Sequence, residues 1–326
     1  MDYTSLGNTD LTVSVAGLGM GGNSRAGRNT GRTEAESIAV IHKAIDLGVT
    51  LFDTASAYGT EELLGKALKS QDRTALVVSS KATIWKGMEP KGGADILEDI
   101  ENTLVALQTD VIDLYQLHAV PPARYDQVLT DILPVLQQAQ RDGKIRYLGI
   151  TETAPKDPGH EMLQHAVGDK VWNVVMLAFH MMHQNARQTI FPTTVKNGVG
   201  TLLMFVLRDL FSRPDFLRET IATLVANGEI PAHLGESGTP LDFLVHNSGA
   251  TSITDAAYRF ARHEQGADVV LFGTGNADHL EENIRSITAP PLPAKDVQVL
   301  YNLFGRLEGV GLRHSDTPGG GGRPHA

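Results

Sequence analysis

Residues 16–24 read AGLGMGGNS, and the glycines in this stretch decide between two α/β folds. Gly17, Gly19 and Gly22 have the G-x-G-x-x-G spacing of a dinucleotide-binding Rossmann loop. That loop needs a helix that begins at the glycines, because the helix N-terminus holds the pyrophosphate. Here the chain continues through NSRAGRNTGR, and the first helix signal comes only near Thr33. We therefore interpret the stretch as the end of a strand in a different α/β fold.

Short apolar runs alternate with amphipathic helical segments over most of the chain. The runs are nearly continuous in apolar residues, as expected of strands covered on both faces. Strand–helix alternation without an obvious linker predicts a (β/α)8 TIM barrel, with a doubly wound sheet and a second domain as the alternative. The eight expected strands are Val13–Gly19, Thr50–Thr54, Ala75–Ser80, Asp113–His118, Tyr147–Thr151, Asn173–Phe179, Gly200–Leu207 and Val269–Gly273.

Helix signals between these runs support the alternation. Thr33 and Glu36 are spaced as a capping box in front of a helical apolar pattern. Pro134 predicts that the helix before the fifth strand begins near Leu133 rather than at Tyr125. Another helix shows an apolar stripe before the fourth strand, formed by Leu97, Ile100, Leu104 and Leu107.

The segments that flank the barrel pattern have their own signatures. DYTSLGNTDLTVS reads as an N-terminal β-hairpin that turns at Gly7–Asn8–Thr9 and caps the closed end of the barrel. We expect residues 1–315 to form a single barrel domain, with residues 208–252 as an insertion or loop region. Residues 316–326 are low in complexity and are expected to be a disordered tail.

Composition narrows the class of protein. The 326 residues carry a formal net charge of −10 with no basic run, which argues against a nucleic-acid or anionic-membrane partner. The chain has no cysteine, so disulfides and thiolate chemistry are excluded. We see no signal-peptide pattern and no apolar run of membrane-spanning length. We expect a cytoplasmic enzyme with a small-molecule substrate, and composition specifies no oligomeric state.

Four polar residues follow or end three consecutive predicted strands. LFDTASAYG supplies Asp53 and Tyr58, VVSSK ends in Lys81, and DLYQLH ends in His118. Active sites of barrels of this type lie where the strands end, so these side chains are expected to converge on one face. Each residue alone has an ordinary structural explanation, but their joint placement favours a catalytic site.

This constellation resembles the aldo-keto reductase family over nearly the whole chain. The motifs that carry the resemblance are FDTASAYG, VVSSK, DLYQLH, GKIRYLGIT and GTGNADHLEEN, in family order and spacing. The resemblance implies a barrel reductase that uses a nicotinamide cofactor, with Asp53, Tyr58, Lys81 and His118 as its catalytic residues.

Elementary chemistry fits these implied roles. Reduction of a carbonyl needs a hydride at carbon and a proton at oxygen, and Tyr58 would supply the proton. A free phenol has a pKa of about 10, which is too high for efficient proton transfer near neutral pH. The Lys81 ammonium would favour the phenolate, while Asp53 would hold and neutralise that lysine. His118, as a neutral imidazole, would donate a hydrogen bond to the carbonyl and orient it.

The resemblance also implies a nicotinamide site. Gly19 and Met20 would lie beside this half of the cofactor, together with Asp53. A Ser-Asn pair common in the family corresponds to Thr151 and Glu152, and a common glutamine corresponds to Met176. The aromatic residue that stacks on the nicotinamide in the family corresponds to Met204, with Phe205 next to it.

The adenosine half is expected near the last two barrel strands. Arg208 is the candidate for the pyrophosphate. The basic residues that bind a 2′-phosphate in many family members correspond to Gly273 and His279, so NADP(H), favoured on family grounds, competes with NAD(H). By resemblance, the remaining phosphate, ribose and adenine contacts are Thr274, Gly275, Asn276, Glu282 and Asn283.

Trp85 is the candidate wall of a substrate pocket shared with Tyr58 and His118. His180 and His183 have no neighbouring carboxylate in sequence, and we expect no metal site. The leading hypothesis is an NAD(P)H-dependent carbonyl reductase. The alternatives are an aldolase or isomerase that uses Lys81 as a Schiff-base amine, and a non-catalytic cofactor-binding barrel.

Overall fold

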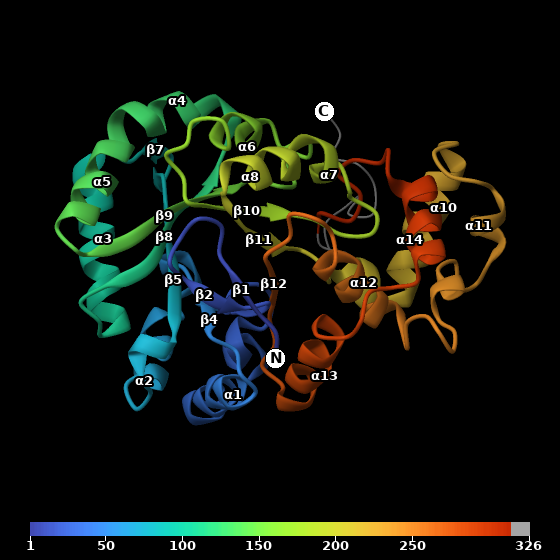
Figure 1. Cartoon of the computed structure of the whole chain (residues 1–326), viewed down its shortest axis with the longest axis horizontal. Helices are drawn as coiled ribbons and strands as arrows, with labels where there is room; N and C mark the ends of the chain where they lie inside the picture. Colours follow the sequence, from blue (N-terminus) through green and yellow to red (C-terminus); the bar gives the residue numbers. More distant parts are fainter. Residues whose placement is uncertain (314–326) are drawn as a thin grey trace.

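Eight parallel strands close into a barrel in the computed structural model, which describes residues 1–313 (Figure 1). Each strand pairs with its neighbour in the chain order of the barrel, and β12 closes the sheet on β3 through the pair Val270 and Ala16. This confirms the (β/α)8 barrel and excludes the doubly wound sheet. The strands are β3 (Ala16–Gly19), β4 (Leu51–Asp53), β5 (Val77–Thr83), β8 (Ile112–Val120), β9 (Ile145–Glu152), β10 (Val174–Ala178), β11 (Gly200–Met204) and β12 (Val269–Phe272).

Helices surround the barrel. The capping box is confirmed at the first of them, where the Glu36 amide donates to Thr33 Oγ1 at 3.3 Å and the Thr33 amide donates to the Glu36 carboxylate at 2.8 Å. The expected stripe on α3 is wrong at Leu97, which is 40% exposed, because Ile96 faces the core in its place. The surrounding helices are α1 (Glu34–Asp46), α2 (Glu61–Leu68), α3 (Gly93–Leu107), α5 (Leu133–Arg141), α6 (Glu161–Ala166), α7 (Ala186–Thr189), α8 (Phe191–Asn197), α12 (Ile253–Arg262), α13 (Ala277–Ile287) and α14 (Ala294–Phe304).

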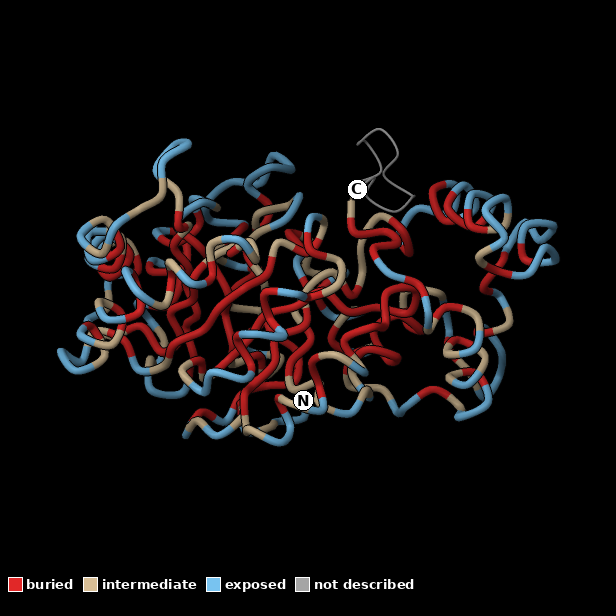
Figure 2. The backbone as a smooth tube through the Cα atoms, turned by 90° about the horizontal axis from the view of Figure 1, so that it is seen from above, coloured by how far each residue is buried: buried red, intermediate tan, exposed pale blue. Residues whose placement is uncertain are grey.

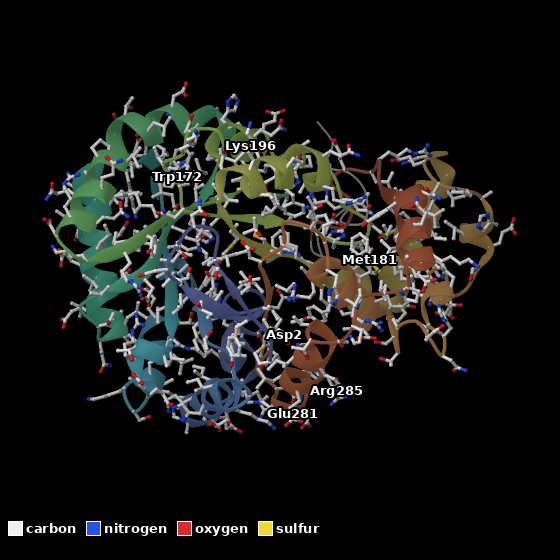
Figure 3. The ribbon with its side chains drawn as sticks, viewed as in Figure 1. Asp2, Trp172, Met181, Lys196, Glu281 and Arg285 are labelled. Atoms are coloured by element: carbon white, nitrogen blue, oxygen red, sulfur yellow. The ribbon has the colours of Figure 1, made fainter. Side chains whose placement is uncertain are left out.

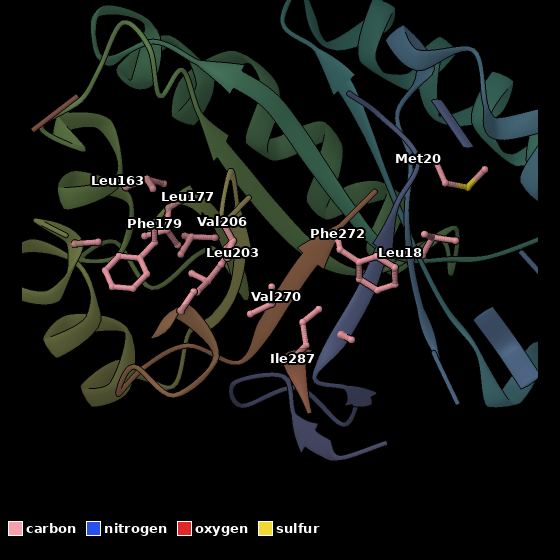
Figure 4. Close-up of a cluster of buried hydrophobic side chains, with 14 of the residues drawn as sticks. Leu18, Met20, Leu163, Leu177, Phe179, Leu203, Val206, Val270, Phe272 and Ile287 are labelled. Atoms are coloured by element: carbon pink, nitrogen blue, oxygen red, sulfur yellow. The ribbon is translucent and has the colours of Figure 1, made fainter. Parts of the chain in front are cut away.

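The hydrophobic core has two main parts. The larger lies between the strands and the helices and includes Leu18, Met20, Val270 and Phe272 (Figure 4). Figure 2 shows the buried residues concentrated in the interior of the molecule, with exposed residues mainly at its periphery. A second cluster fills the inside of the barrel at its closed end. The interior there is a packed core without a channel, so polar side chains can gather only at the opposite end.

The N-terminal hairpin closes that end, as predicted. β1 (Tyr3–Ser5) pairs antiparallel with β2 (Thr12–Ser14). The hairpin side chains Leu6, Leu11 and Val13 belong to the inner cluster with the first residues of the barrel strands. The hairpin therefore removes the apolar bottom of the barrel from water.

All eight predicted strands have somewhat different bounds in the structure, and two of them are shortened by local features of the chain. The run Val13–Gly19 is split, because Val13 belongs to the hairpin and the barrel strand begins at Ala16. The run Gly200–Leu207 ends at Met204, because Phe205 adopts a left-handed backbone conformation with φ of 65°. A strand cannot continue through that conformation.

The helix α5 begins at Leu133, as predicted, but other helical turns precede it in the chain. Helical structure starts at α4 (Tyr125–Gln127) and continues through a π turn, η5 (Val128–Ile132), into α5. The Leu133 amide donates to the Val128 carbonyl, so the wider turn accommodates Pro134, which has no amide hydrogen.

Residues 208–252 contain more regular structure than a loop region. They form α9 (Asp209–Ser212), α10 (Pro214–Ala226), α11 (His233–Glu236) and the 3-10 turn η6 (Asp242–Leu244), which project to one side of the barrel (Figure 1). Phe216, Ile221 and Leu224 of α10 are buried in the main core cluster, so this segment packs as part of the same body. The expected tail, residues 316–326, lies outside the described residues.

Candidate active site

The open end of the barrel brings the four candidate catalytic side chains together. Asp53 is the last residue of β4, and Tyr58 lies in the short turn η2 (Ser56–Tyr58) that follows it. Lys81 and His118 lie on β5 and β8, whose residues Thr83 and His118 are paired. Parallel strands end on the same face, so residues distant in sequence meet here.

Lys81 is fully buried beneath the phenol. Its Nζ donates to Asp53 Oδ2 at 2.6 Å and to the Thr54 carbonyl at 2.8 Å, and it lies 4.9 Å from the centre of the Tyr58 ring. Burial opposes the charge on the amine, but the negative charge of Asp53 and the adjacent Tyr58 outweigh it, so the pKa of Lys81 is raised. The lysine is therefore an ammonium ion fixed against the phenol.

Tyr58 and His118 present polar atoms at one point. The Tyr58 hydroxyl lies 3.3 Å from His118 Nε2, and the two rings meet edge to face with centres 5.4 Å apart. Burial, and then the charge of Lys81, lower the pKa of His118 to about 3. The imidazole is therefore neutral near neutral pH and can donate one hydrogen bond without carrying a charge.

Two further side chains fix Asp53, and sequence reasoning missed both. Ser79 Oγ donates to Asp53 Oδ1 at 2.9 Å, and Gln116 Nε2 donates to Ser79 Oγ at 2.8 Å. Each lies two positions before a candidate catalytic residue on the same strand, Ser79 before Lys81 and Gln116 before His118. Side chains on a strand alternate between faces, so this spacing was the signal that could have found them.

Gly21 is a third residue that sequence reasoning missed. A Cβ atom at Gly21 would lie 2.6 Å from Cε2 of the Tyr58 ring, closer than carbon atoms can approach. Any larger residue would push the phenol out of its place. The glycine stretch that ends the first barrel strand therefore helps to position Tyr58.

A cleft of about 520 Å³ begins at Tyr58 and crosses the barrel mouth. Among the predicted site residues, those that line it are Gly19, Asp53, Tyr58, Met176, Met204, Arg208, Gly273, Thr274, His279, Glu282 and Asn283. It is also lined by Phe205 and by Gly22, Asn23 and Ser24 of the loop after β3.

Five predicted cofactor residues do not line this cleft, and three of them are Met20, Gly275 and Asn276. The side chain of Met20 is fully buried in the main core (Figure 4). Gly275 packs against the loop after β3, where an added Cβ would lie 2.3 Å from the Gly27 Cα. Asn276 caps α13, its side chain accepting the Asp278 amide at 2.9 Å.

Thr151 and Glu152 are buried and make other bonds. Thr151 Oγ1 accepts the Ala119 amide at 2.7 Å. Glu152 Oε1 accepts the Ala178 amide at 2.8 Å, and Oε2 lies 2.6 Å from His160 Nδ1. Both carboxylate oxygens are thus engaged inside the protein, which is why Glu152 does not line the cleft.

Trp85 lies in a short hairpin beyond the cleft lining. It begins β6 (Trp85–Lys86), which pairs with β7 (Glu89–Pro90) after β5. The Arg124 guanidinium lies 5.2 Å from the centre of its ring and comes from the turn η4 (Pro122–Arg124) after β8. This contact joins the loops that follow Lys81 and His118.

Arg208 lies over the cleft at the end of β11. Its guanidinium stacks 3.7 Å from the centre of the Phe205 ring and donates to the Leu312 carbonyl at 3.2 Å. Its Nε is buried without a hydrogen-bond partner within the described residues. A buried donor in this state indicates a site for an acceptor.

The far end of the cleft is formed by α13. His279, Glu282 and Asn283 line the cleft, while Glu281 and Arg285 project from the outer side of the same helix (Figure 3). Arg208 is the one arginine among the cleft-lining residues of the described chain, and no lysine lines it. The end of the cleft away from Tyr58 therefore has little positive charge.

Three histidines are buried beside the mouth. The His160 ring centre lies 5.1 Å from that of His183, which lies 5.8 Å from that of His180. Within residues 1–313, no group of three or more His, Asp or Glu side chains is arranged to hold a metal ion.

A larger cavity of about 850 Å³ lies away from this mouth. Its walls come from α11, η6 and α14, and it contains none of the predicted site residues. In the described part of the chain, no helix has the length and apolar character needed to cross a membrane.

Comparisons with known proteins agree with the barrel fold. The sequence profile of the Aldo/keto reductase family matches residues 17–303. The chain is 28% identical over 319 residues to aldo-keto reductase YhdN of Bacillus subtilis, covering 91% of each protein. It is 25% identical over 320 residues to L-galactose dehydrogenase of Arabidopsis thaliana, covering 95% of each. The holo form of an aldo-keto reductase from Bacillus halodurans has the same fold, with a TM-score of 0.70 at 22% identity over 93% of this chain and 96% of that one.

Proposed function

We propose, from the premise that this chain belongs to the aldo/keto reductase family, that it interconverts a carbonyl group and an alcohol at Tyr58, with a nicotinamide cofactor in the cleft beside it. Membership of the family supports the general class of enzyme, a nicotinamide-dependent oxidoreductase that acts on carbonyl compounds. The observation that supports the finer statement is the fully buried Lys81 ammonium held between Asp53 and the Tyr58 ring.

The cleft has features that fit such a cofactor. Its lining includes Gly19 at the end of β3 and Gly273 directly after β12, and neither has a side chain that would project into the cleft. A Cβ at Gly273 would lie 3.0 Å from the Gly19 carbonyl oxygen, so the two backbones lie close together. The unpartnered Nε of Arg208 would meet the diphosphate. Met176, Met204 and Phe205 would hold the nicotinamide, and Thr274, His279, Glu282 and Asn283 the adenosine. The bound cofactor supplies the hydride that adds to the carbonyl carbon.

The side chains of the protein supply the proton for the carbonyl oxygen and stabilise the charge that remains. The Tyr58 hydroxyl donates its proton to the carbonyl oxygen, and His118 Nε2–H donates a hydrogen bond to the same oxygen as negative charge develops there. The phenolate left on Tyr58 is stabilised by the Lys81 ammonium, 4.9 Å from its ring. Asp53 keeps that ammonium in place, and in alcohol oxidation the same groups act in reverse.

The geometry opposes the Schiff-base alternative. An amine that attacks a carbonyl must lose its proton, which requires a lowered pKa. Burial acts in that direction on Lys81, but Asp53 raises its pKa overall, and the side chain is fully buried. Borohydride trapping of a substrate on Lys81 would favour that alternative.

Direct binding and turnover measurements test the proposal. NADPH and NADH are titrated separately, followed by turnover on aldehydes, ketones and sugars, including an aldose because one relative is L-galactose dehydrogenase. We expect carbonyl-dependent oxidation of a bound cofactor. We also expect the two dissociation constants to agree within about tenfold. Among the described residues that line the cleft, Arg208 is the one arginine and there is no lysine to select a 2′-phosphate.

Two results would contradict these expectations. A hundredfold preference for NADPH, on the order of 3 kcal/mol, would mean that a basic side chain outside the cleft lining reaches the 2′-phosphate. Binding of cofactor without turnover of any carbonyl would favour the non-catalytic barrel.

A further inference from the structure

We infer that Thr151 is a positioning residue for His118, and that it acts by holding the strained backbone of Ala119. The inference rests on the proposed function, because it concerns the imidazole that would orient the substrate carbonyl. It departs from the expectation that Thr151 binds the nicotinamide.

The pairing of β8 with β9 is interrupted next to His118. Leu117 pairs with Ile150, and the next pair is Val120 with Glu152. Two residues of β8, His118 and Ala119, therefore lie opposite the single residue Thr151. This is a β-bulge, a device that changes the direction of a side chain at the rim of a barrel.

Because of the bulge, the side chains of His118 and Val120 point to different faces of β8. In an uninterrupted strand these two residues would point the same way. Instead, Val120 is buried in the main core cluster with Tyr115 and Leu117, whereas the His118 imidazole contacts Tyr58 at the barrel mouth. The extra residue lets β8 keep its outer packing while the imidazole is delivered to the site.

Ala119 carries the strain of this arrangement. Its φ is 55°, in the left-handed region that residues with a Cβ rarely adopt. A conformation of this kind persists only where its surroundings impose it. A specific contact must therefore hold the peptide that follows His118.

Thr151 supplies that contact. The Ala119 amide donates to Thr151 Oγ1 at 2.7 Å, so the side chain replaces the ladder partner that the bulge removes. Thr151 is 1% exposed and does not line the cleft. Its neighbour Glu152 is fixed by the Ala178 amide and by His160, which makes the end of β9 a rigid support.

Thr151→Val is the direct test, because valine keeps the shape of threonine but cannot accept a hydrogen bond. We expect kcat to fall about 10- to 100-fold from displacement of His118, with the cofactor dissociation constant changed by less than about twofold. Without cofactor or substrate, the Ala119 amide should exchange its hydrogen faster than in the wild type. Thr151→Ser, which restores the acceptor, should recover both properties.

Thr201→Val is a matched control. The Thr201 hydroxyl also accepts a backbone amide, that of Asp268 at 2.9 Å, but it lies at the first residues of β11, at the closed end of the barrel. We expect this variant to keep the wild-type kcat and the wild-type exchange at Ala119. A second variant, Ala119→Gly, removes the Cβ strain and should restore part of the kcat when added to Thr151→Val.

The outcomes separate the inference from the proposed function. If Thr151→Val weakens cofactor binding but leaves kcat at saturation unchanged, Thr151 is a nicotinamide contact and the inference is wrong. Unchanged exchange at Ala119 would also overturn it. If the wild type reduces no carbonyl, the proposed function fails, and with it the role given to His118. The exchange measurement would still show whether Thr151 holds the Ala119 amide.

Discussion

Asp53 and Lys81 form a buried ion pair at the proposed catalytic site. Both side chains are almost completely buried, and Asp53 receives hydrogen bonds from Lys81, Ser79 and Gln116. A buried pair of this kind adds little net stability, but removal of one partner leaves an uncompensated charge in the core. The pair therefore makes a sharp prediction at the level of single residues.

Asp53→Asn should lower the free energy of unfolding by about 3–5 kcal/mol, measured by denaturant titration. The double variant Asp53→Asn with Lys81→Met should regain most of that stability, because no buried charge is left, but it should remain inactive. If the single variant were as stable as the wild type, the Lys81 amine would be neutral in the folded protein, and its proposed role would fail.

Between elements, the end of β9 is tied to the loops around it by His160. His160 Nδ1 lies 2.6 Å from Glu152 Oε2, and Nε2 lies 3.0 Å from Asn185 Oδ1. The Asn185 amide is oriented by its own donation to the Pro158 carbonyl, so both ring nitrogens face acceptors. Burial opposes the charge, but Glu152 and Asn185 favour it more strongly and raise the pKa of His160.

The raised pKa gives this cluster a defined pH dependence. A histidine whose pKa is raised on folding contributes stability below its unfolded pKa of about 6.5, and this contribution is lost as pH rises through the folded value. The difference in unfolding free energy between the wild type and His160→Gln should therefore be largest at acidic pH and should shrink as the solution becomes alkaline.

His180→Gln is the control of opposite sign. Burial, with a smaller contribution from Arg208, lowers the pKa of His180 to about 3, so only the unfolded chain takes up this proton near pH 6. The wild type should thus lose stability relative to this variant as pH falls. If both differences changed in the same direction, His160 would not be charged in the folded protein.

Sequence patterns predicted the presence of the barrel strands better than the residues at which strands and helices begin and end. Apolar runs located all eight barrel strands, since burial on both faces leaves a continuous signal. The stop at Phe205, the bulge at Ala119 and the π turn before Pro134 depend on local backbone geometry and tertiary contacts, which residue types do not encode.

For the candidate site too, some features could be predicted from the sequence and others could not. Asp53, Tyr58, Lys81 and His118 stand at strand ends or just after them, so topology alone brings them together. Thr151 and Glu152 lie at the expected place in the chain, but their side chains bond to backbone and to His160. Which way a side chain points at a barrel rim depends on the register of its neighbours, and the sequence of one strand does not specify that.

At the scale of the whole molecule, the barrel separates stability from chemistry. The hairpin and the inner apolar cluster close one end, while the polar groups and the cleft of about 520 Å³ lie at the other. The helices α9, α10 and α11 extend from the cleft side at β11, where Arg208 and Asp209 line the opening. The described part of the chain thus places Tyr58 beside the cleft in which we propose that the cofactor binds.

The Tyr58→Phe variant tests this reaction centre most directly. Its carbonyl-reduction rate and its quenching of bound NADPH or NADH fluorescence are measured side by side with those of the wild type. Because a positioned general acid accelerates such a reaction by about 10²- to 10⁴-fold, we expect kcat/KM to fall at least about a hundredfold while cofactor quenching stays at the wild-type level. Near-normal turnover by the variant would contradict the assignment of Tyr58 as the proton donor.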